Sequence, residues 1–253
     1  MDDSTSSSEI WPVKYTGLSY GLLVINCSAV LFYLIGRVAA ACISESAKHA
    51  PWRWKNTIVS FTHACISGSW SVMCFYETPK LAEDMITTYS SFSYTLISFS
   101  VGYFVYDVVD MLLYQRTRQG LELLGHHAVL LMCYMVAITT HMYVGYAVVG
   151  LIVEVNSIFL HLRQILQIQG FQKDNSFYRM NSLINLGTFI VCRITLLAWM
   201  TRWIVINKDH VPLLFYTMGS VGLAVLTLMN IILFYRVLMS DFVRKKDTRS
   251  KNE

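Results

Sequence analysis

The sequence predicts an all-α membrane protein with seven transmembrane helices. Of its 253 residues, 55% are hydrophobic and only 14% are charged, whereas a soluble globular domain carries about 25% charged residues. The apolar residues are gathered into seven blocks of about 20 residues, the length that crosses roughly 30 Å of hydrocarbon as a helix. The low charge and the uniform block length together exclude an ordinary soluble domain.

The seven blocks follow one another along nearly the whole chain. All four prolines lie at or outside the block ends, so none interrupts a helix. The chain starts with a polar, acidic segment that does not resemble a cleaved signal peptide, and we expect the first block to remain as an anchor. In chain order the blocks are 16–36, 56–76, 90–113, 121–140, 144–164, 180–206 and 212–239.

Lysine and arginine are abundant in every second connection between the blocks. There are four in 36–55, two in 114–120, two in 165–179 and five in 243–253, but at most one in each of the other segments. By the positive-inside rule, the N-terminus is outside and the C-terminus is cytosolic. We therefore expect a polar tail at 1–15, one membrane domain at 16–242 and a basic cytosolic tail at 243–253. Beside a span, such a tail favours anionic lipid over nucleic acid.

The cysteines and histidines do not form a metal-binding pattern. The six cysteines lie within the blocks or at their edges and include no C-x-x-C pair, so we interpret them as small apolar residues. Three of the seven histidines lie in loops or turns, which leaves too few in the spans for the histidine clusters of membrane metal oxygenases. We expect no metal site and no disulfide framework.

Ionisable and polar side chains inside the blocks recur at helical spacing. Such residues are costly in hydrocarbon and usually face the bundle interior, so they are candidates for a site. The spacing of each set places it on one face of its helix. The sets are Ser60, His63 and Ser67; Tyr103, Asp107, Asp110 and Tyr114; Glu154, Ser157 and His161; and Asn181, Asn185 and Arg193.

The fourth block adds two adjacent histidines, His126 and His127. Adjacent residues point about 100° apart on a helix, so we expect at most one of them to aim straight into the bundle. By the predicted topology these polar groups share the cytosolic half. We expect a histidine of the pair to approach Glu154, lined by His63 and Asp107, in a cavity open to the cytosol or the inner leaflet.

A histidine held by a carboxylate suits acyl transfer. It can act as a general base, or as a nucleophile that forms an acyl-imidazole, toward a lipid amine or hydroxyl. The alternative is that the polar stripes only pack the helices together, as we expect for the serines and asparagines. The candidate catalytic residues are His126, His127 and Glu154, and the candidate substrate-binding residues are His63, Asp107, Asp110, Ser157 and Arg193.

Three segments in this order resemble the TLC-domain family, whose best-known members are the ceramide synthases. They are Gly-Tyr-Phe-Val-Tyr-Asp at 102–107, the pair His126-His127, and Glu-Val-Asn-Ser at 154–157. The resemblance implies a TLC-type helical bundle and matches the pair to the family's catalytic histidines. Where ceramide synthases carry Asp-x-x-Asp, this chain has Glu154 and Ser157.

Further segments are similar to the TLC domain-containing proteins of the calfacilitin type. These are Trp-Arg-Trp-Lys-Asn at 52–56, Val-Ser-Phe-Thr-His at 59–63, Val-Glu-Val at 153–155 and the closing run at 236–242. The resemblance implies a multi-pass protein that limits polyunsaturated acyl chains in phospholipids, phosphatidylethanolamine especially, and so lowers membrane fluidity. It implies the plasma membrane as location, with the endoplasmic reticulum as the alternative.

Three other functions stay open from the residues. The first is a non-catalytic lipid-binding or channel-modulating scaffold, which the serine at 157 favours. The second is a ceramide synthase-like N-acyltransferase, and the third is a seven-helix receptor, which the lack of paired extracellular cysteines opposes. For acyl transfer we expect no bound cofactor, only acyl-CoA or a phospholipid as acyl donor. Membrane lipids are the expected partners.

Overall fold

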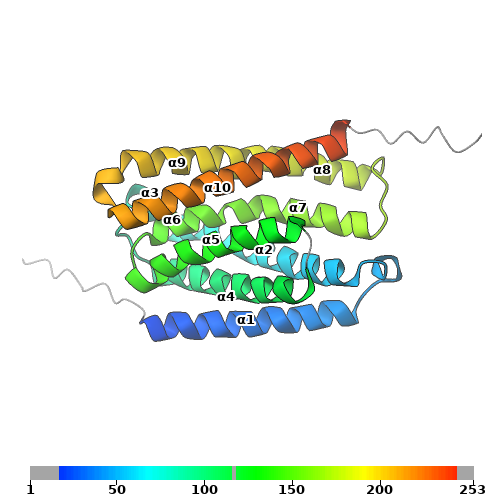
Figure 1. The fold of residues 1–253 in the computed structure, drawn as a ribbon, viewed down its shortest axis with the longest axis horizontal. Coiled ribbons are helices and arrows are strands. Elements are labelled where there is room, and N and C mark those ends of the chain that lie inside the picture. Colours follow the sequence, from blue (N-terminus) through cyan, green and yellow to red (C-terminus); the bar gives the residue numbers. More distant parts are fainter. Residues whose placement is uncertain (1–16, 116–117, 244–253) are drawn as a thin grey trace, which may run out of the picture.

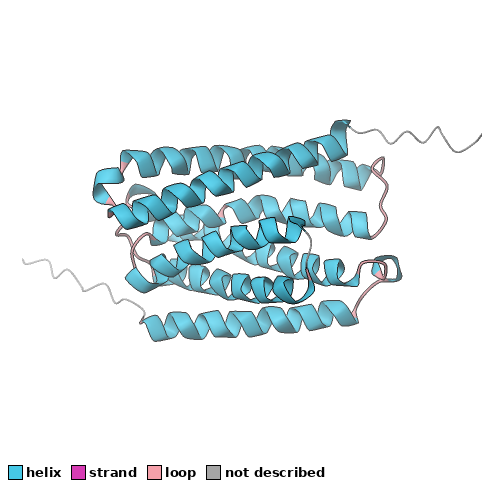
Figure 2. Cartoon of the chain, viewed as in Figure 1, coloured by secondary structure: helices cyan, strands magenta, loops and turns pink. Residues whose placement is uncertain are grey.

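A computed structural model describes residues 17–115 and 118–243, and this part of the chain consists of helices joined by loops and turns, without strands (Figures 1 and 2). Seven helical stretches in it are long and apolar enough to cross a membrane. The predicted all-helical fold with seven spans is therefore confirmed. The polar tail expected at 1–15 and the basic tail beyond Val243 lie outside the described residues.

Several spans extend beyond the predicted blocks. The second begins at Pro51 and not at residue 56, because proline suits the first turn of a helix. The long helices are α1 (Leu18–Ala41), α2 (Pro51–Glu77), α4 (Ser91–Tyr114), α5 (Arg118–Thr140), α6 (Val144–Leu151), α7 (Val153–Ile168), α8 (Ser176–Phe189), α9 (Leu196–Ile206) and α10 (Leu213–Leu238). The short elements are η1 (Glu45–Ala47), α3 (Lys80–Glu83), η2 (Ile190–Thr195), η3 (Lys208–His210) and η4 (Met239–Val243).

The last three spans contain irregular turns that block lengths do not predict. The fifth span is divided at Ile152 into α6 and α7. The sixth span joins α8 to α9 through η2, and the seventh ends in η4; both are π-helical turns. A π turn inserts an extra residue into a helix and is frequent at functional sites, so η2 directs attention to the middle of the sixth span.

The helices form a bundle with α1 along one edge and α8, α9 and α10 along the opposite edge (Figure 1). Glycine allows close contact at two junctions. A Cβ atom on Gly102 would lie 2.4 Å from the carbonyl oxygen of Ile25, so α4 packs directly on the backbone of α1. A Cβ atom on Gly68 would lie 3.0 Å from the backbone nitrogen of Val155, so α2 packs directly on α7. The second contact fixes α7 one residue from Glu154.

The two ends of the bundle differ in charge. We call one the basic end, where α1 and α4 end and α2 and α8 begin, and the other the opposite end. The described lysines and arginines near the basic end are Arg37, Lys48, Arg53, Lys55, Arg163, Lys173, Arg179 and Arg236, and those near the opposite end are Lys80, Arg202 and Lys208. The alternation of charge along the sequence thus becomes a separation in space.

At the basic end, the buried carboxylate of Asp241, just after α10, joins this helix to α7 and α8. Two nitrogens of Arg163, on α7, each lie 2.6 Å from an oxygen of Asp241. Asp241 also accepts hydrogen bonds from Tyr178 at 3.1 Å and from Ser182 at 3.0 Å, both on α8. We call these four residues the Asp241 joint. Every member has a partner, so the joint fixes three helices at one level.

Candidate functional site

The two adjacent histidines of α5 face different neighbours. His127 is buried against α4, where its Nδ1 lies 3.1 Å from Oδ2 of Asp107. His126 lines a cavity bounded by α7 and α10. Their ring centroids are 5.5 Å apart. Because α5 packs against both α4 and α10, the two directions about 100° apart both lead into the protein. The expectation that at most one histidine points inward is therefore wrong.

Asp107 is held between two helices. One carboxylate oxygen faces His127, and the other accepts a hydrogen bond of 2.6 Å from Nδ2 of Asn56 on α2. Asp107 is only 1% exposed. Nδ1 of His127 faces this carboxylate without hydrogen-bond geometry, so the contact is one of close approach between the two groups. Asn56 was not among the expected site residues, although it ends the run at 52–56 that resembles other proteins.

Two further histidines complete this polar cluster. His63, on α2, stacks on the ring of Tyr103 with centroids 3.9 Å apart and lies within electrostatic range of His127 and His161. Nε2 of His63 and Nδ1 of His161 are buried without a hydrogen-bond partner among the described residues. His161 was missing from the expected site. Its signal was present in the sequence, since it continues the stripe of Glu154 on α7.

Arg193 lies at the centre of the bundle, in the π turn η2. Its Nε donates to Asn156 at 2.7 Å, its Nη1 to Asn230 at 2.8 Å and its Nη2 to Ser157 at 2.8 Å. All three acceptors are neutral oxygens, and the guanidinium is buried. The acceptors come from α7 and α10, so Arg193 ties the sixth span to both. Of these acceptors, only Ser157 was expected at the site.

Glu154 carries the charge that faces Arg193. It follows the break at Ile152, and its carboxylate interacts electrostatically with Arg193 and His127. A buried guanidinium without an opposite charge nearby would be strongly unfavourable. The structure therefore brings Glu154, Arg193 and Ser157 together, as the stripes indicate, with His126 on the facing wall of the cavity.

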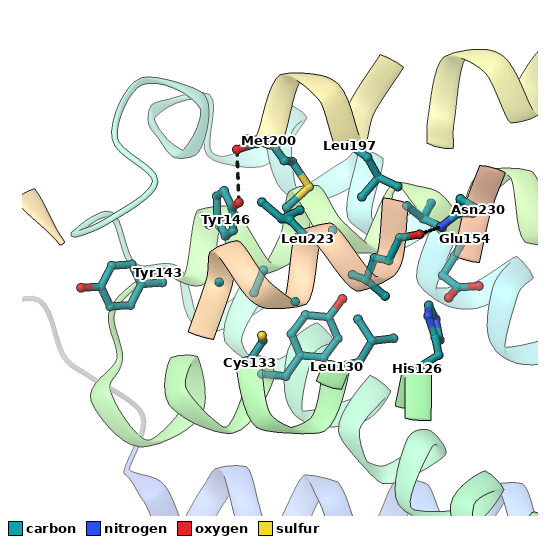
Figure 3. Close-up of a pocket in the computed structure, with 17 residues that line it drawn as sticks. His126, Leu130, Cys133, Tyr143, Tyr146, Glu154, Leu197, Met200, Leu223 and Asn230 are labelled. Atoms are coloured by element: carbon teal, nitrogen blue, oxygen red, sulfur yellow. Dashed lines mark hydrogen bonds between the residues drawn. The ribbon is translucent and has the colours of Figure 1, made fainter. Parts of the chain in front are cut away.

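The cavity has a polar end and an apolar length. His126, Glu154 and Asn230 line one end, and Tyr143 lies at the other (Figure 3). The volume is about 100 Å³, and an adjoining hollow of about 70 Å³ shares Cys133, Tyr143, Tyr146 and Gly219 with it. The remaining wall of the first cavity is Leu130, Tyr134, Ala147, Gly150, Val153, Leu197, Met200, Gly222, Leu223 and Leu226.

This cavity does not run in the expected direction. It extends from the middle of the spans toward the opposite end, whereas we expected it to open toward the basic end. Between Asn230 and Gly219 it follows α10 for on the order of 16 Å, about half the hydrocarbon thickness. The reason lies in side-chain volume. Polar groups fill the basic half, while Gly150, Gly219 and Gly222 leave space in the other half.

Asp110 lies away from this centre. It accepts a hydrogen bond of 2.9 Å from Nε1 of Trp52, and its other oxygen pairs with Nζ of Lys55. Both partners come from the first turns of α2, so Asp110 joins α2 to α4 at the basic end. Asp107 and Asp110 are both buried on α4, as the helical spacing predicts. Asp110 nevertheless contacts the start of α2, whereas Asp107 faces His127 in the middle of the polar cluster.

The described residues contain no group of three or more histidine, cysteine or acidic side chains arranged to hold a metal ion. All six cysteines are free thiols. The buried histidines therefore meet one another and carboxylates without forming a ligand set. What this arrangement can do chemically is proton transfer or nucleophilic attack at the polar end of an apolar cavity.

Comparison with known proteins identifies the family. The TLC domain matches residues 53–239, which include every candidate site residue and exclude only α1 among the spans. The chain belongs to the TLC domain family. It is 52% identical over 214 residues to TLC domain-containing protein 2 of Danio rerio, with 83% of this chain and 87% of the relative covered. It is 36% identical over 205 residues to TLC domain-containing protein 1 of Mus musculus, with 80% and 81% covered.

The resemblance seen in the sequence is therefore confirmed at the level of the family. The human TLC domain-containing protein 1 is 35% identical over 204 residues, with 79% of this chain and 81% of the relative covered. The TLC domain here is thus a membrane bundle whose centre holds His126, His127, Asp107, Glu154 and Arg193.

Proposed function

We propose that this protein binds the acyl chain of a membrane lipid in the cavity and transfers acyl groups with His126 and Glu154. By this activity it limits polyunsaturated chains in membrane phospholipids, phosphatidylethanolamine especially. The observation that carries the proposal is that His126 and Glu154 line the same end of a largely apolar cavity. An acyl chain matches the apolar wall, and its carbonyl group matches the polar end.

The chemistry follows from the groups at that end. His126 removes a proton from the attacking hydroxyl or amine, or attacks the acyl carbonyl itself. Glu154 stabilises the imidazolium that forms, and Arg193 keeps a positive charge beside Glu154. Apolar walls exclude water from the reacting carbonyl and strengthen these electrostatic interactions. The acyl donor is acyl-CoA or a phospholipid. Its acyl–sulfur or acyl–oxygen bond breaks, coenzyme A or a lysophospholipid leaves with the proton that His126 returns to it, and no other cofactor is needed.

The location and the orientation are also part of the proposal. The cations of the basic end support a cytosolic basic end and an external N-terminus. The likeness to TLC domain-containing proteins supports the plasma membrane and gives the direction of the effect on unsaturation. In this orientation the acyl cavity occupies the outer half of the bilayer, and the charged centre lies near its middle.

One observation favours a second function, a non-catalytic lipid-binding scaffold. Ser157 stands where ceramide synthases carry a second carboxylate, and its Oγ accepts a hydrogen bond from Arg193. The residue therefore has a structural partner, and it lacks the carboxylate that would accept a proton in its place. A scaffold would bind the same acyl chain but would need neither His126 nor Glu154 as a reacting group.

Lipidomics on cells that lack the protein separates these functions. Deletion should raise the polyunsaturated fraction of phosphatidylethanolamine, and the wild-type protein should restore it. His126→Gln and Glu154→Gln should fail to restore it at equal protein level, since general base catalysis contributes roughly 10²- to 10⁴-fold in rate. The matched control is His210→Gln, an exposed histidine of η3, which should restore it fully.

Two results would contradict the proposal in different ways. Full rescue by both cavity variants would show that the lipid effect does not depend on the chemistry, and the scaffold would replace the enzyme. An unchanged lipid composition after deletion would remove both functions.

A further inference from the structure

A tyrosine in the cavity wall has no role in the chemistry described so far. Tyr134 lies on α5, two helical turns beyond His126, and is 4% exposed. Its ring packs against Phe104 with centroids 5.9 Å apart. This packing fixes the ring on the side of α4, while the residue also lines the cavity. The direction of its hydroxyl is therefore set by the fold.

The hydroxyl of Tyr134 differs from those of two other tyrosines, the half-buried Tyr146 and the buried Tyr103. Tyr146 donates to the carbonyl oxygen of Met200 at 3.3 Å, and Tyr103 donates to Ser60 at 3.0 Å. No hydrogen bond of the Tyr134 hydroxyl is found within the described part of the chain, and its oxygen is not among the fully enclosed polar atoms that lack a partner. A hydroxyl with no hydrogen-bond partner in the protein can donate to an acceptor that a ligand supplies, and that bond would stabilise the complex.

The surroundings place this hydroxyl beside the reacting groups. A Cβ atom on Gly150 would lie 3.3 Å from the Tyr134 oxygen, so the glycine leaves space for the hydroxyl across the cavity. Glu154 follows one helical turn later on the same span and interacts electrostatically with Tyr134. The hydroxyl thus lies next to the polar end that His126 and Glu154 form, where the apolar wall begins.

Two other polar groups of the wall are already engaged. Asn230 accepts from Arg193 at 2.8 Å and donates to the carbonyl oxygen of Leu226 at 2.8 Å. Tyr146 is bonded to Met200, as described above. The Tyr134 hydroxyl is therefore a neutral donor near the polar end that a bound molecule can use.

We propose that the Tyr134 hydroxyl donates a hydrogen bond to the carbonyl oxygen of an acyl ester or thioester bound in the cavity. In an acyl lipid, the carbonyl is the acceptor at the junction between the methylene chain and the polar remainder, which is where this hydroxyl lies along the cavity. The hydrogen bond fixes the carbonyl carbon next to His126. This inference rests on the proposed function and adds the residue that recognises its substrate.

Infrared spectroscopy of a labelled lipid tests this contact. The full-length protein is purified, stripped of lipid and loaded with phosphatidylethanolamine whose oleoyl carbonyl carries carbon-13. Hydrogen bonding lowers the stretching frequency of the ester carbonyl. The wild type should show the lowered band, and so should the control Tyr94→Phe, which removes a buried hydroxyl bonded to the carbonyl oxygen of Ile138 outside the cavity wall. Tyr134→Phe should lose the band. Tyr134→Phe should also bind the lipid about fivefold more weakly, the effect of one neutral hydrogen bond.

A second variant reaches the same contact from the other wall. Gly150→Ala places a methyl group against the Tyr134 oxygen, 3.3 Å away before any movement, and should also diminish the lowered band. If both variants keep the wild-type band, the hydrogen bond is assigned to the wrong residue, while lipid binding itself stands. If the wild type retains no labelled lipid, this inference fails together with the acyl-binding part of the proposed function.

Discussion

Two buried clusters in this protein contain arginine and carboxylate groups, and they differ in how completely their hydrogen bonds are made. In the Asp241 joint, the carboxylate accepts from Arg163, Tyr178 and Ser182, and the arginine is paired directly with it. We call Arg193, Glu154 and the nearby histidines His63, His127 and His161 the central cluster. In it, Arg193 donates hydrogen bonds to neutral oxygens, and Glu154 interacts with Arg193 electrostatically without a direct ion pair. Every residue of the Asp241 joint thus has a hydrogen-bond partner, whereas the central cluster contains polar atoms without one.

The unsatisfied atoms of the central cluster point to function. Nε2 of His63 and Nδ1 of His161 have no hydrogen-bond partner among the described residues. Nδ1 of His127 lies 3.1 Å from Asp107 but without hydrogen-bond geometry. Buried polar atoms are normally satisfied, and exceptions mark strain, catalysis or a missing ligand. Because a cavity adjoins the incomplete cluster, this cluster is the better candidate for a site, whereas the Asp241 joint holds helices together.

The largest expected effect breaks the complete cluster. Asp241→Asn leaves the buried guanidinium of Arg163 without its opposite charge, which should lower the free energy of unfolding by about 3–5 kcal/mol. Thermal unfolding in detergent measures this. Glu45→Gln, which removes an exposed ion pair with Lys48, should leave the unfolding temperature unchanged. Lipid rescue by Asp241→Asn should follow the protein level, and inactivity at a normal level would give the joint a functional role.

A smaller effect is expected when the forked guanidinium group of Arg193 is replaced in the central cluster. Arg193→Lys keeps the positive charge near Glu154 but cannot reach Asn156, Ser157 and Asn230 together, because lysine lacks the planar fork. We expect the free energy of unfolding to fall by about 2–4 kcal/mol. We expect the variant to restore in part the lipid composition of cells that lack the protein. Arg193→Gln removes the charge as well and should abolish rescue. An Arg193→Gln variant with full rescue would show that Glu154 needs no counter-charge.

The contact between α2 and α7 can be tested by comparing a glycine at this contact with a glycine that has open space around it. Gly68→Ala forces a methyl group against the backbone at Glu154 and Val155, which should destabilise the protein by about 1–3 kcal/mol and displace Glu154. Gly187→Ala, on α8, meets nothing within 4 Å and should be neutral or stabilising. Thermal unfolding of both variants, with lipid rescue, compares them. Equal behaviour would mean that α7 adjusts freely at this level.

The smallest effect lies outside the spans, in the connection after α3. The hydrogen bond from the Thr87 hydroxyl, with further bonds from backbone amides, lowers the pKa of Asp84. Because the folded pKa is depressed, this contribution to stability is present above the unfolded pKa and is lost as pH falls through the folded pKa. Thr87→Val should therefore reduce stability slightly at neutral pH and not in strong acid. A difference that persists in acid would indicate packing and not the carboxylate.

Much of the fold follows from the sequence, because a span needs a fixed length of apolar residues. The seven blocks match the seven spans to within about five residues, and the stripes bring Asp107, Glu154 and Arg193 into one centre. Periodicity gives the face of a helix but not its neighbour. It could not show that Asp110 pairs with Lys55, three residues from Asp107.

The missing features arise from packing between distant segments. The π turn that holds Arg193 and the break at Ile152 depend on contacts with other helices, and no local residue pattern marks them. The direction of the cavity depends on glycines of α6 and α10 that face α5 and α9, which a single sequence does not reveal. Sequence reasoning therefore located the charged centre and missed the apolar space beside it.

The central claim is that a lipid acyl chain lies in this cavity with its carbonyl at His126 and Glu154. Photo-crosslinking with a phosphatidylethanolamine that carries a diazirine in its acyl chain tests it directly. We predict labels on cavity residues such as Cys133 and Tyr146, removed by excess unlabelled lipid and by Gly222→Trp, which fills the space. Labels confined to lipid-facing residues of α1 such as Leu23 and unchanged by Gly222→Trp would contradict the account.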